Sequence, residues 1–233
     1  MKKIEDYRKK YIGFYNKFRL VVNQYGCYPN NLEFDINNED GSDLKKVSLK
    51  NPIFLQKWPI KKAMPVKNVD ILIHADFQYR PQNKRLIEHS RSSVYVTYLL
   101  HEKHEKTAIP LENIRFDYNP RPTADGESHP LIHAHVFSNK RPQIQMPPPV
   151  KFEVNWDKLN DRLNSFRLPI PNMNLPSVLC CLVACHLGAD KIRDLMNNTE
   201  DERRDFPGLA IDEDQRNLLY ANPFAGSQWF ERT

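Results

Sequence analysis

The sequence predicts an α+β fold, in which a central antiparallel meander sheet is flanked by an N-terminal amphipathic helix and C-terminal helices. Apolar residues recur at helical spacing in residues 1–25, apolar and polar residues alternate within 67–140, and helical patterns return within 151–233. No helical segment interrupts the alternating region, which disfavours a parallel sheet with crossover helices. We therefore expect a single domain over residues 1–233, with a helix in 1–25, the sheet core in 67–140 and a mainly helical part in 151–233.

The composition is that of a globular protein and removes the support for several enzyme classes. Hydrophobic residues make up 40% of the 233 residues, and 18 prolines against 7 glycines indicate stiff connections rather than glycine-rich loops. None of the motifs GxGxxG, GxxxxGKS/T and GxSxG occurs. Dinucleotide-binding, P-loop and serine-hydrolase functions are therefore not expected.

The chain carries no pattern for export or membrane insertion. Residues 1–18 are charged and aromatic, without the apolar stretch and cleavage site of a signal peptide. The longest apolar run, residues 178–187, is far shorter than the roughly 20 residues that cross a bilayer. We expect a cytoplasmic protein with no membrane partner. That run holds Cys180, Cys181 and Cys185, and free cysteine in such a setting behaves as a small buried hydrophobe.

The first segment carries the pattern of an amphipathic helix. Its apolar stripe consists of Ile4, Tyr7, Tyr11, Phe14, Phe18 and Val21. The lysines off that stripe are Lys3, Lys9, Lys10 and Lys17. Residues 1–67 hold 14 Lys and Arg against 7 Asp and Glu, whereas residues 189–233 hold 6 against 10. The basic end is either a solvated surface or a contact surface for a phosphate backbone or an acidic partner. If it contacts a phosphate backbone, these four lysines bind nucleic acid.

The next segment is expected to be irregular. Residues 37–46 are polar and predict a loop or a hairpin tip. Prolines at 52, 59 and 65 interrupt residues 50–68, where we expect little regular structure.

Four runs with a period of two follow and predict the meander. They are rich in β-branched and aromatic residues and span residues 69–79, 92–104, 113–118 and 129–137. Side chains two apart in a strand share a face, so Arg115 and Asp117 are opposite their apolar neighbours, and His133 lies with His135. If the strands pair in order, these residues and Asp76 converge on one polar face.

Such a face allows two kinds of chemistry. Two histidines two apart can bind one divalent metal, with Asp117 as a third ligand, for metal-assisted hydrolysis. Alternatively, His133 and His135 act as base and acid in phosphodiester cleavage without a metal, while Asp117 orients a histidine and Arg115 neutralises a phosphate oxygen. A further alternative is that these are ordinary residues of an exposed strand, with Asp117 paired to Arg115.

The region of these residues resembles a known family. FDYNP at 116–120, HPLIHAHVF at 129–137 and RPQIQMPPP at 141–149 are similar to an uncharacterised prokaryotic family with an Asp-Tyr strand followed by a His-Pro-x-x-His-x-His strand. The resemblance covers residues 114–149, with a looser likeness in the later apolar helix. It implies a toxin–antitoxin or phage-defence setting, with nucleic acid as target or a partner protein that supplies the activity. The positions implied are Asp117, Tyr118, His129, His133 and His135.

The C-terminal part is expected to be mainly helical. Asn174 as N-cap, Pro176 in the first turn and Gly188 after the last turn delimit a short buried helix that covers one face of the sheet. Further helices are expected around residues 156–166 and within the acidic segment 199–219. The apolar residues of 218–230 either pack on this domain or bury against a second copy or another subunit.

Two functions remain open from the sequence. The first is a prokaryotic defence or toxin-type protein that acts on nucleic acid, as a phosphodiesterase or nuclease with His133, His135, Asp117 and Arg115 in the site. The second is a non-catalytic subunit of a multiprotein defence or nucleic-acid-processing complex. We expect a protein partner or a homo-oligomer, and a divalent metal is a candidate cofactor.

Overall fold

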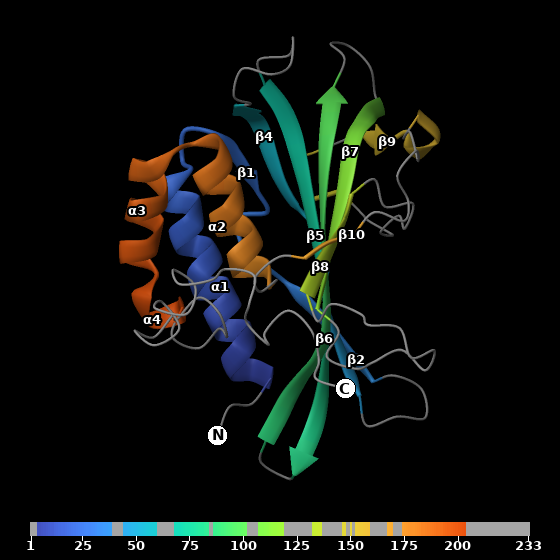
Figure 1. The fold of residues 1–233 in the computed structure, drawn as a ribbon, viewed down its shortest axis with the longest axis vertical. Coiled ribbons are helices and arrows are strands. Elements are labelled where there is room, and N and C mark those ends of the chain that lie inside the picture. The colour runs from blue at the N-terminus through green and yellow to red at the C-terminus, as the bar shows by residue number, and fades with distance from the viewer. Residues whose placement is uncertain are drawn as a thin grey trace.

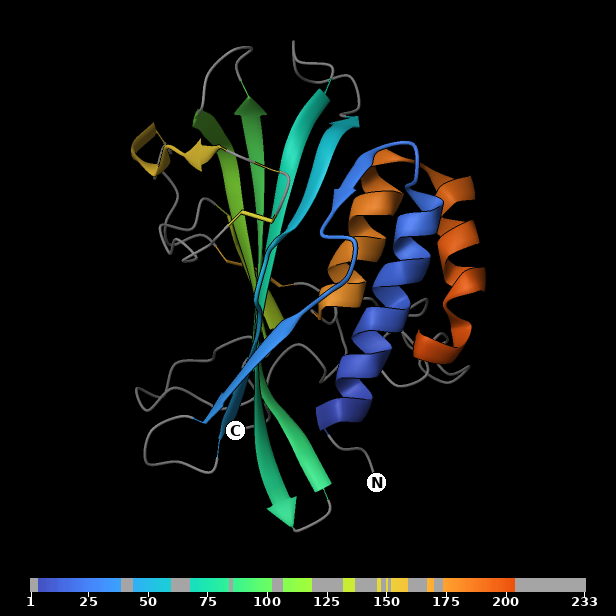
Figure 2. The same cartoon turned by 180° about the vertical axis from the view of Figure 1, so that it is seen from behind.

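The structure is a computed structural model that describes residues 4–38, 44–59, 68–83, 86–101, 107–118, 132–136, 146–147, 150, 152–158, 167–169 and 174–203. Helices pack on one face of a mostly antiparallel sheet, as the sequence predicts (Figures 1 and 2). The helices are α1 (Ile4–Val21), α2 (Leu175–His186), α3 (Ala189–Asn198) and α4 (Glu200–Arg203), with a short 3-10 turn, η1 (Trp156–Lys158).

The sheet has ten strands among the described residues. They are β1 (Gly26–Tyr28), β2 (Phe34–Asn38), β3 (Lys45–Leu49), β4 (Ile53–Pro59), β5 (Asn68–Asn83), β6 (Leu86–His101), β7 (Thr107–Tyr118), β8 (Ile132–Val136), β9 (Glu153–Val154) and β10 (Arg167–Pro169). The main path is β1-β4-β5-β6-β7-β8-β10, and β3 pairs with the later part of β5 and with β2. All these pairs are antiparallel, whereas β9 pairs with β7 in parallel. The predicted meander is therefore present as β5-β6-β7-β8.

The expectation of little regular structure in residues 50–68 was wrong for its first part. Ile53–Pro59 forms β4, which pairs with β1 and β5. Pro52 precedes the strand and Pro59 ends it, so neither proline interrupts the middle of the ladder. The fully buried Trp58 then anchors the strand in the core.

The core lies between α1, α2 and one sheet face. Tyr11, Phe14 and Phe18 of the predicted stripe are buried, and Tyr11 stacks on Phe77 of β5 with ring centroids 4.8 Å apart. Tyr15 is also fully buried, outside the predicted stripe, and its hydroxyl donates to the Pro29 carbonyl over 2.6 Å. Phe77 itself is fully buried on this face of β5.

The helix α2 has the predicted ends. The Asn174 side chain accepts from the Ser177 amide over 2.9 Å, and Pro176 lies in the first turn. Gly188 follows the helix with φ of 93°, a conformation that glycine adopts without strain. The prediction that all cysteines of this run are buried was wrong: Cys180 is buried, but Cys181 and Cys185 are exposed because they lie on the outer side of the helix.

The C-terminal expectations are only partly covered by the described residues. Within residues 156–166 the described part is the turn η1, and within 199–219 it is Thr199 with α4. The segment 218–230, with its predicted apolar contacts, lies outside the described residues. Within the described chain, no helix is both long and apolar enough to span a bilayer.

Candidate functional site

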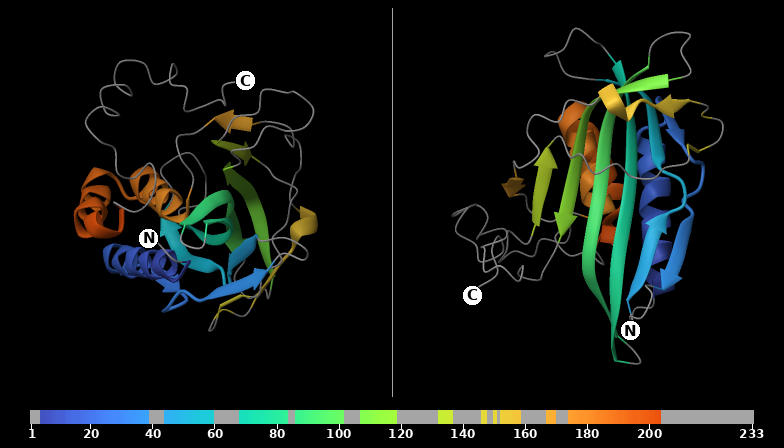
Figure 3. Two further views of the ribbon diagram at one scale, coloured as in Figure 1. Left: turned by 90° about the horizontal axis from the view of Figure 1, so that it is seen from below. Right: turned by 90° about the vertical axis from the view of Figure 1, so that its right-hand side faces the viewer.

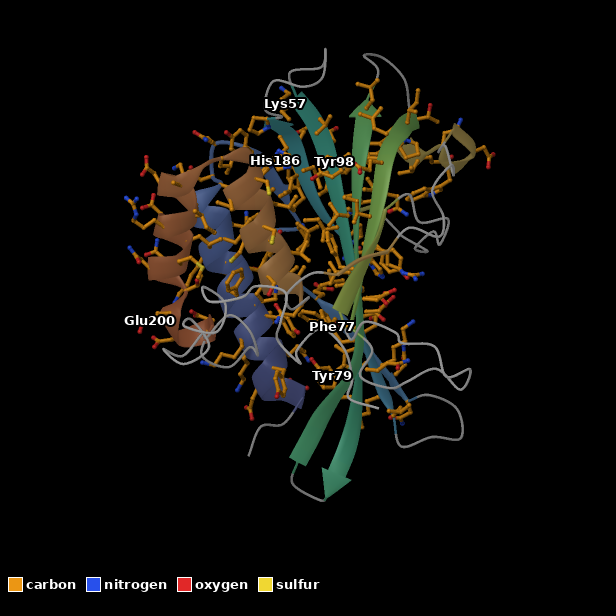
Figure 4. The ribbon with its side chains drawn as sticks, in the orientation of Figure 1. Lys57, Phe77, Tyr79, Tyr98, His186 and Glu200 are labelled. Carbon is orange, nitrogen blue, oxygen red and sulfur yellow. The ribbon has the colours of Figure 1, made fainter. Side chains whose placement is uncertain are left out.

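The candidate site lies on the sheet face turned away from the helices, which we call the far face; it faces the viewer in the right-hand view of Figure 3. Phe77 and Tyr79 of β5 contact Tyr11 and Tyr7 of α1 (Figure 4), so the alternate residues of β5 belong to the far face. Directly paired residues of an antiparallel sheet share a face, which extends the far face across the strands.

Polar residues cross the far face from strand to strand, and we call them the polar row. The row consists of Lys46 and Ser48 of β3, His74 and Asp76 of β5, Ser93 and Tyr95 of β6, and Arg115 and Asp117 of β7. The registers Ser48 with Asp76, Asp76 with Ser93, His74 with Tyr95, Ser93 with Asp117 and Tyr95 with Arg115 connect them.

An ion pair between Arg115 and Asp117 forms the β7 end of the row. Arg115 Nε donates to Asp117 Oδ2 over 2.7 Å, and the two side chains are 10% and 14% exposed. Ser93 Oγ donates to the other carboxylate oxygen, Oδ1, over 2.6 Å. Both oxygens of Asp117 are therefore hydrogen-bonded, and the carboxylate fixes the position of the guanidinium.

A second charged group surrounds Asp76 on β5. Its Oδ1 lies 3.5 Å from His74 Nε2 and 3.8 Å from Lys46 Nζ. Burial favours the neutral carboxyl, but hydrogen bonds from His74 and Ser48, the charge of His74 and the Lys46 ammonium outweigh it, so the pKa of Asp76 is lowered. His74 is only 8% exposed, and its Nδ1 has no hydrogen-bond partner within the described residues. That nitrogen is a buried polar atom that a ligand or a water could satisfy.

Tyr95 joins the two charged groups. Its ring centroid lies 6.3 Å from that of His74, and it is paired with Arg115 in the register of β6 with β7. Burial raises the pKa of Tyr95, with the negative charges of Asp76 and Asp117 acting in the same direction against the lowering effect of Arg115. The phenol thus stays protonated near neutral pH and can donate a hydrogen bond.

The strand β8 brings the predicted histidine positions to this end of the row. His133 is paired with Asp117 and His135 with Arg115, and β10 pairs with β8 on its other side. Positions 133 and 135 therefore belong to the far face, as the alternation predicts. The side chains of His133 and His135 lie outside the described residues, as does His129.

The rest of the far face is apolar toward β9. Phe54, Leu72, Leu99, Ala108 and Phe152 form a buried cluster there. Between this cluster and the polar row, Thr97 Oγ1 donates to Asn113 Oδ1 over 2.8 Å. On its β9 side, the polar row is therefore bordered by this buried apolar cluster and by the Thr97–Asn113 pair.

The site residues predicted from the sequence are thus brought together by backbone register, and their roles stay predictions. Arg115, Asp117 and positions 133 and 135 are adjacent, whereas Asp76 lies two strands away, beyond Ser93. Among the residues that the structure describes, no three or more His, Cys, Asp and Glu side chains are grouped so as to hold a metal ion.

Of the predicted nucleic-acid contacts, the three that the structure describes lie on α1, on the other side of the sheet. Lys3 is outside the described residues, and Lys9 is exposed on α1. Lys10 Nζ donates to the Asp201 carbonyl over 3.3 Å, and Lys17 Nζ to Glu202 Oε2 over 2.8 Å. Two of these lysines therefore contact the acidic helix α4 of the same chain.

Sequence reasoning missed several members of the row. Ser93 and Tyr95 alternate with the buried Val94 and Val96, a signal that assigns them to the far face. Lys46 and Ser48 carried no comparable signal, because β3 joins the sheet through pairing with β5. Lys46 also lies at the end of residues 37–46, which were expected to form a loop or a hairpin tip.

Comparison with protein-family models, curated proteins and solved structures finds no match. The resemblance seen in residues 114–149 stays a prediction.

Proposed function

We propose that this protein hydrolyses phosphodiester bonds of nucleic acid at the polar row, as a prokaryotic defence or toxin-type nuclease. The proposal is carried by the register of β7 with β8, which pairs two histidine positions with a buried Arg–Asp ion pair. A cation for the phosphate and two groups that titrate near neutral pH are what metal-free phosphodiester cleavage requires. The defence or toxin setting is supported by the resemblance of residues 114–149.

In this proposal Arg115 binds the scissile phosphate. Its Nε is used by Asp117, so the terminal Nη groups contact a non-bridging oxygen and offset the charge that develops there. One of His133 and His135 takes a proton from water as the water oxygen bonds to phosphorus. The other gives a proton to the leaving ester oxygen as its bond to phosphorus breaks. Exchange of these two protons with solvent restores both histidines.

Asp117 serves as a positioning residue in this scheme. Its carboxylate accepts from both Arg115 and Ser93, which suits an orienting group better than a metal ligand. We therefore favour the metal-free route over a divalent metal held by His133, His135 and Asp117. His74, with its buried Nδ1, and Tyr95 extend the set of groups that can contact the substrate next to the scissile phosphate.

The alternative of a non-catalytic docking subunit has less support. As a docking subunit, the protein would use its basic first helix and its acidic C-terminal segment as surfaces for partners. Lys10 and Lys17 of α1 contact Asp201 and Glu202 of α4, so part of both surfaces is used within the chain.

The proposal is tested with labelled single-stranded and duplex DNA and RNA in the presence of EDTA. We expect wild-type cleavage and a loss of at least about 100-fold in His133→Ala/His135→Ala, because proton transfer contributes about 10²–10⁴-fold. The matched control, His101→Ala/His104→Ala, removes the chain's other closely spaced histidine pair and should keep the activity. Full activity in the His133/His135 variant would overturn the proposal. Activity that requires a divalent metal would reassign these residues to the metal route.

A further inference from the structure

The hairpin of β5 and β6 continues past its neighbouring strands. The pairing of β3 with β5 ends at Tyr79, and the pairing of β7 with β6 ends at Ser92. In the described sheet, residues 80–83 and 86–91 have no pairing partner outside this hairpin, within which Arg80 pairs with Glu88, Pro81 with Ile87 and Asn83 with Leu86. Figures 1 and 2 show this end of the hairpin projecting beyond the helices and the other strands. We call residues 80–91 the arm.

The sequence of the arm is strongly basic. It holds Arg80, Lys84, Arg85 and Arg91 against Glu88 as its single acidic residue. By comparison, Lys17 of α1 pairs with Glu202 and Arg115 of the polar row pairs with Asp117. A two-stranded ribbon with such an excess of positive charge complements a phosphate backbone.

The arm also leads to the candidate site. Along β5, position 80 continues the alternation of His74 and Asp76, and on β6 Arg91 is paired with Gln78, two residues before Ser93. Positions 80 and 91 therefore belong to the far face, in line with the polar row. Two residues of a strand span about 7 Å, so a phosphate backbone lying along the arm reaches the row without a gap.

We propose that the arm is a DNA-binding β-ribbon that holds a duplex by its phosphates and leads it to the polar row. This inference rests on the proposed function for the identity of the substrate as nucleic acid. The major groove of B-form DNA, about 12 Å wide, admits a two-stranded ribbon. The major groove of an RNA duplex is deep and too narrow for protein side chains to read, so duplex DNA is the occupant we assign to the arm. Register shifts at Gln78/Tyr79 and Pro81/Asn83 add twist, which helps a ribbon to follow a groove.

The test measures binding of a labelled DNA duplex by fluorescence anisotropy at several salt concentrations. We expect Arg80→Glu/Arg91→Glu to weaken binding at least about tenfold and to reduce the slope of log affinity against log salt by about 2, because each phosphate contact contributes nearly one unit. The control, Lys191→Glu/Arg193→Glu, makes the same change in net charge on α3 and should stay within about twofold of wild type. Arg80→Gln/Arg91→Gln gives a milder second variant in case charge reversal disturbs the hairpin.

The possible results distinguish a failure of the arm proposal from a failure of the nuclease proposal. Equal losses in the arm and control variants, equal binding of duplex RNA through the arm, or no duplex DNA binding by the wild type would each overturn the arm proposal. Cleavage of nucleic acid that is unchanged in both arm variants would also overturn it, while the proposed function would stand. Arm-dependent DNA binding without any cleavage would support the arm and overturn the nuclease proposal.

Discussion

Replacement of Asp117 tests whether this carboxylate holds a buried guanidinium in the polar row. Asp117 and Arg115 are joined over 2.7 Å, with side chains only 14% and 10% exposed. Opposite unit charges about 4 Å apart attract by roughly 4 kcal/mol at an effective dielectric constant of about 20. Removal of one partner from a buried pair leaves the other charge uncompensated and costs about 3–5 kcal/mol. We therefore expect Asp117→Ala to lower the free energy of unfolding by about 3–4 kcal/mol.

Urea unfolding followed by tryptophan fluorescence measures this loss. Arg115→Met/Asp117→Ala leaves no buried charge at the pair, so its loss should be smaller than the sum of the two single losses by about 2 kcal/mol. The control Ser93→Ala removes one hydrogen bond to the same carboxylate and should cost about 1–2 kcal/mol. A loss below about 1 kcal/mol for Asp117→Ala, or additive losses in the double variant, would refute this reasoning.

Three further predictions concern the stability of the fold. Asn174→Ala should cost about 1 kcal/mol in urea unfolding, because it removes the side chain that caps α2 at Ser177; no change would mean that the cap is not needed. Burial raises the pKa of the Cys27 thiol from 9.0 to about 11, which favours the neutral thiol in the folded state. The resulting stabilisation of the folded state should be complete below pH 9 and lost as the pH rises through 11. The difference in free energy of unfolding between wild type and Cys27→Ala should therefore shrink between pH 8 and pH 11. A constant difference would contradict the raised pKa of Cys27. The Lys17–Glu202 pair, whose side chains are 36% and 13% exposed, should contribute less than about 1 kcal/mol in a double-mutant cycle, and a larger coupling would show that α4 is held mainly by this pair.

Local sequence patterns were sufficient for the elements whose burial is periodic. The three- and four-residue spacing of Tyr11, Phe14 and Phe18 predicts α1, because one stripe of a helix faces the core. The two-residue spacing of Ile71 and Ile73 predicts β5 for the corresponding reason. In β4, Phe54 and Leu55 are both buried, so alternation is absent because both faces of the strand are covered. The prolines at its ends then suggested irregular structure.

The sequence predicts which face of the sheet each candidate site residue belongs to. It does not predict which strands pair or which distant residues contact each other. Alternation alone assigns Arg115 and Asp117 to the face opposite Ile114 and Phe116. The attachment of β3 to β5 depends on pairing that skips β4, which a local pattern does not encode. The contact of Lys17 with Glu202 joins residues 185 positions apart, so the sequence indicated only that the two ends have opposite charge.

The central claim is that the two histidine positions of β8 act as base and acid beside Arg115, and the pH dependence of cleavage in EDTA tests it most directly. An unperturbed imidazole titrates near pH 6.5, and a reaction that needs one neutral and one protonated imidazole has a bell-shaped rate profile. We predict a maximum between about pH 5 and 8, with His133→Ala and His135→Ala each flattening one limb of the profile. A rate that changes in one direction only across this range, or a bell that persists in both single variants, would contradict the account.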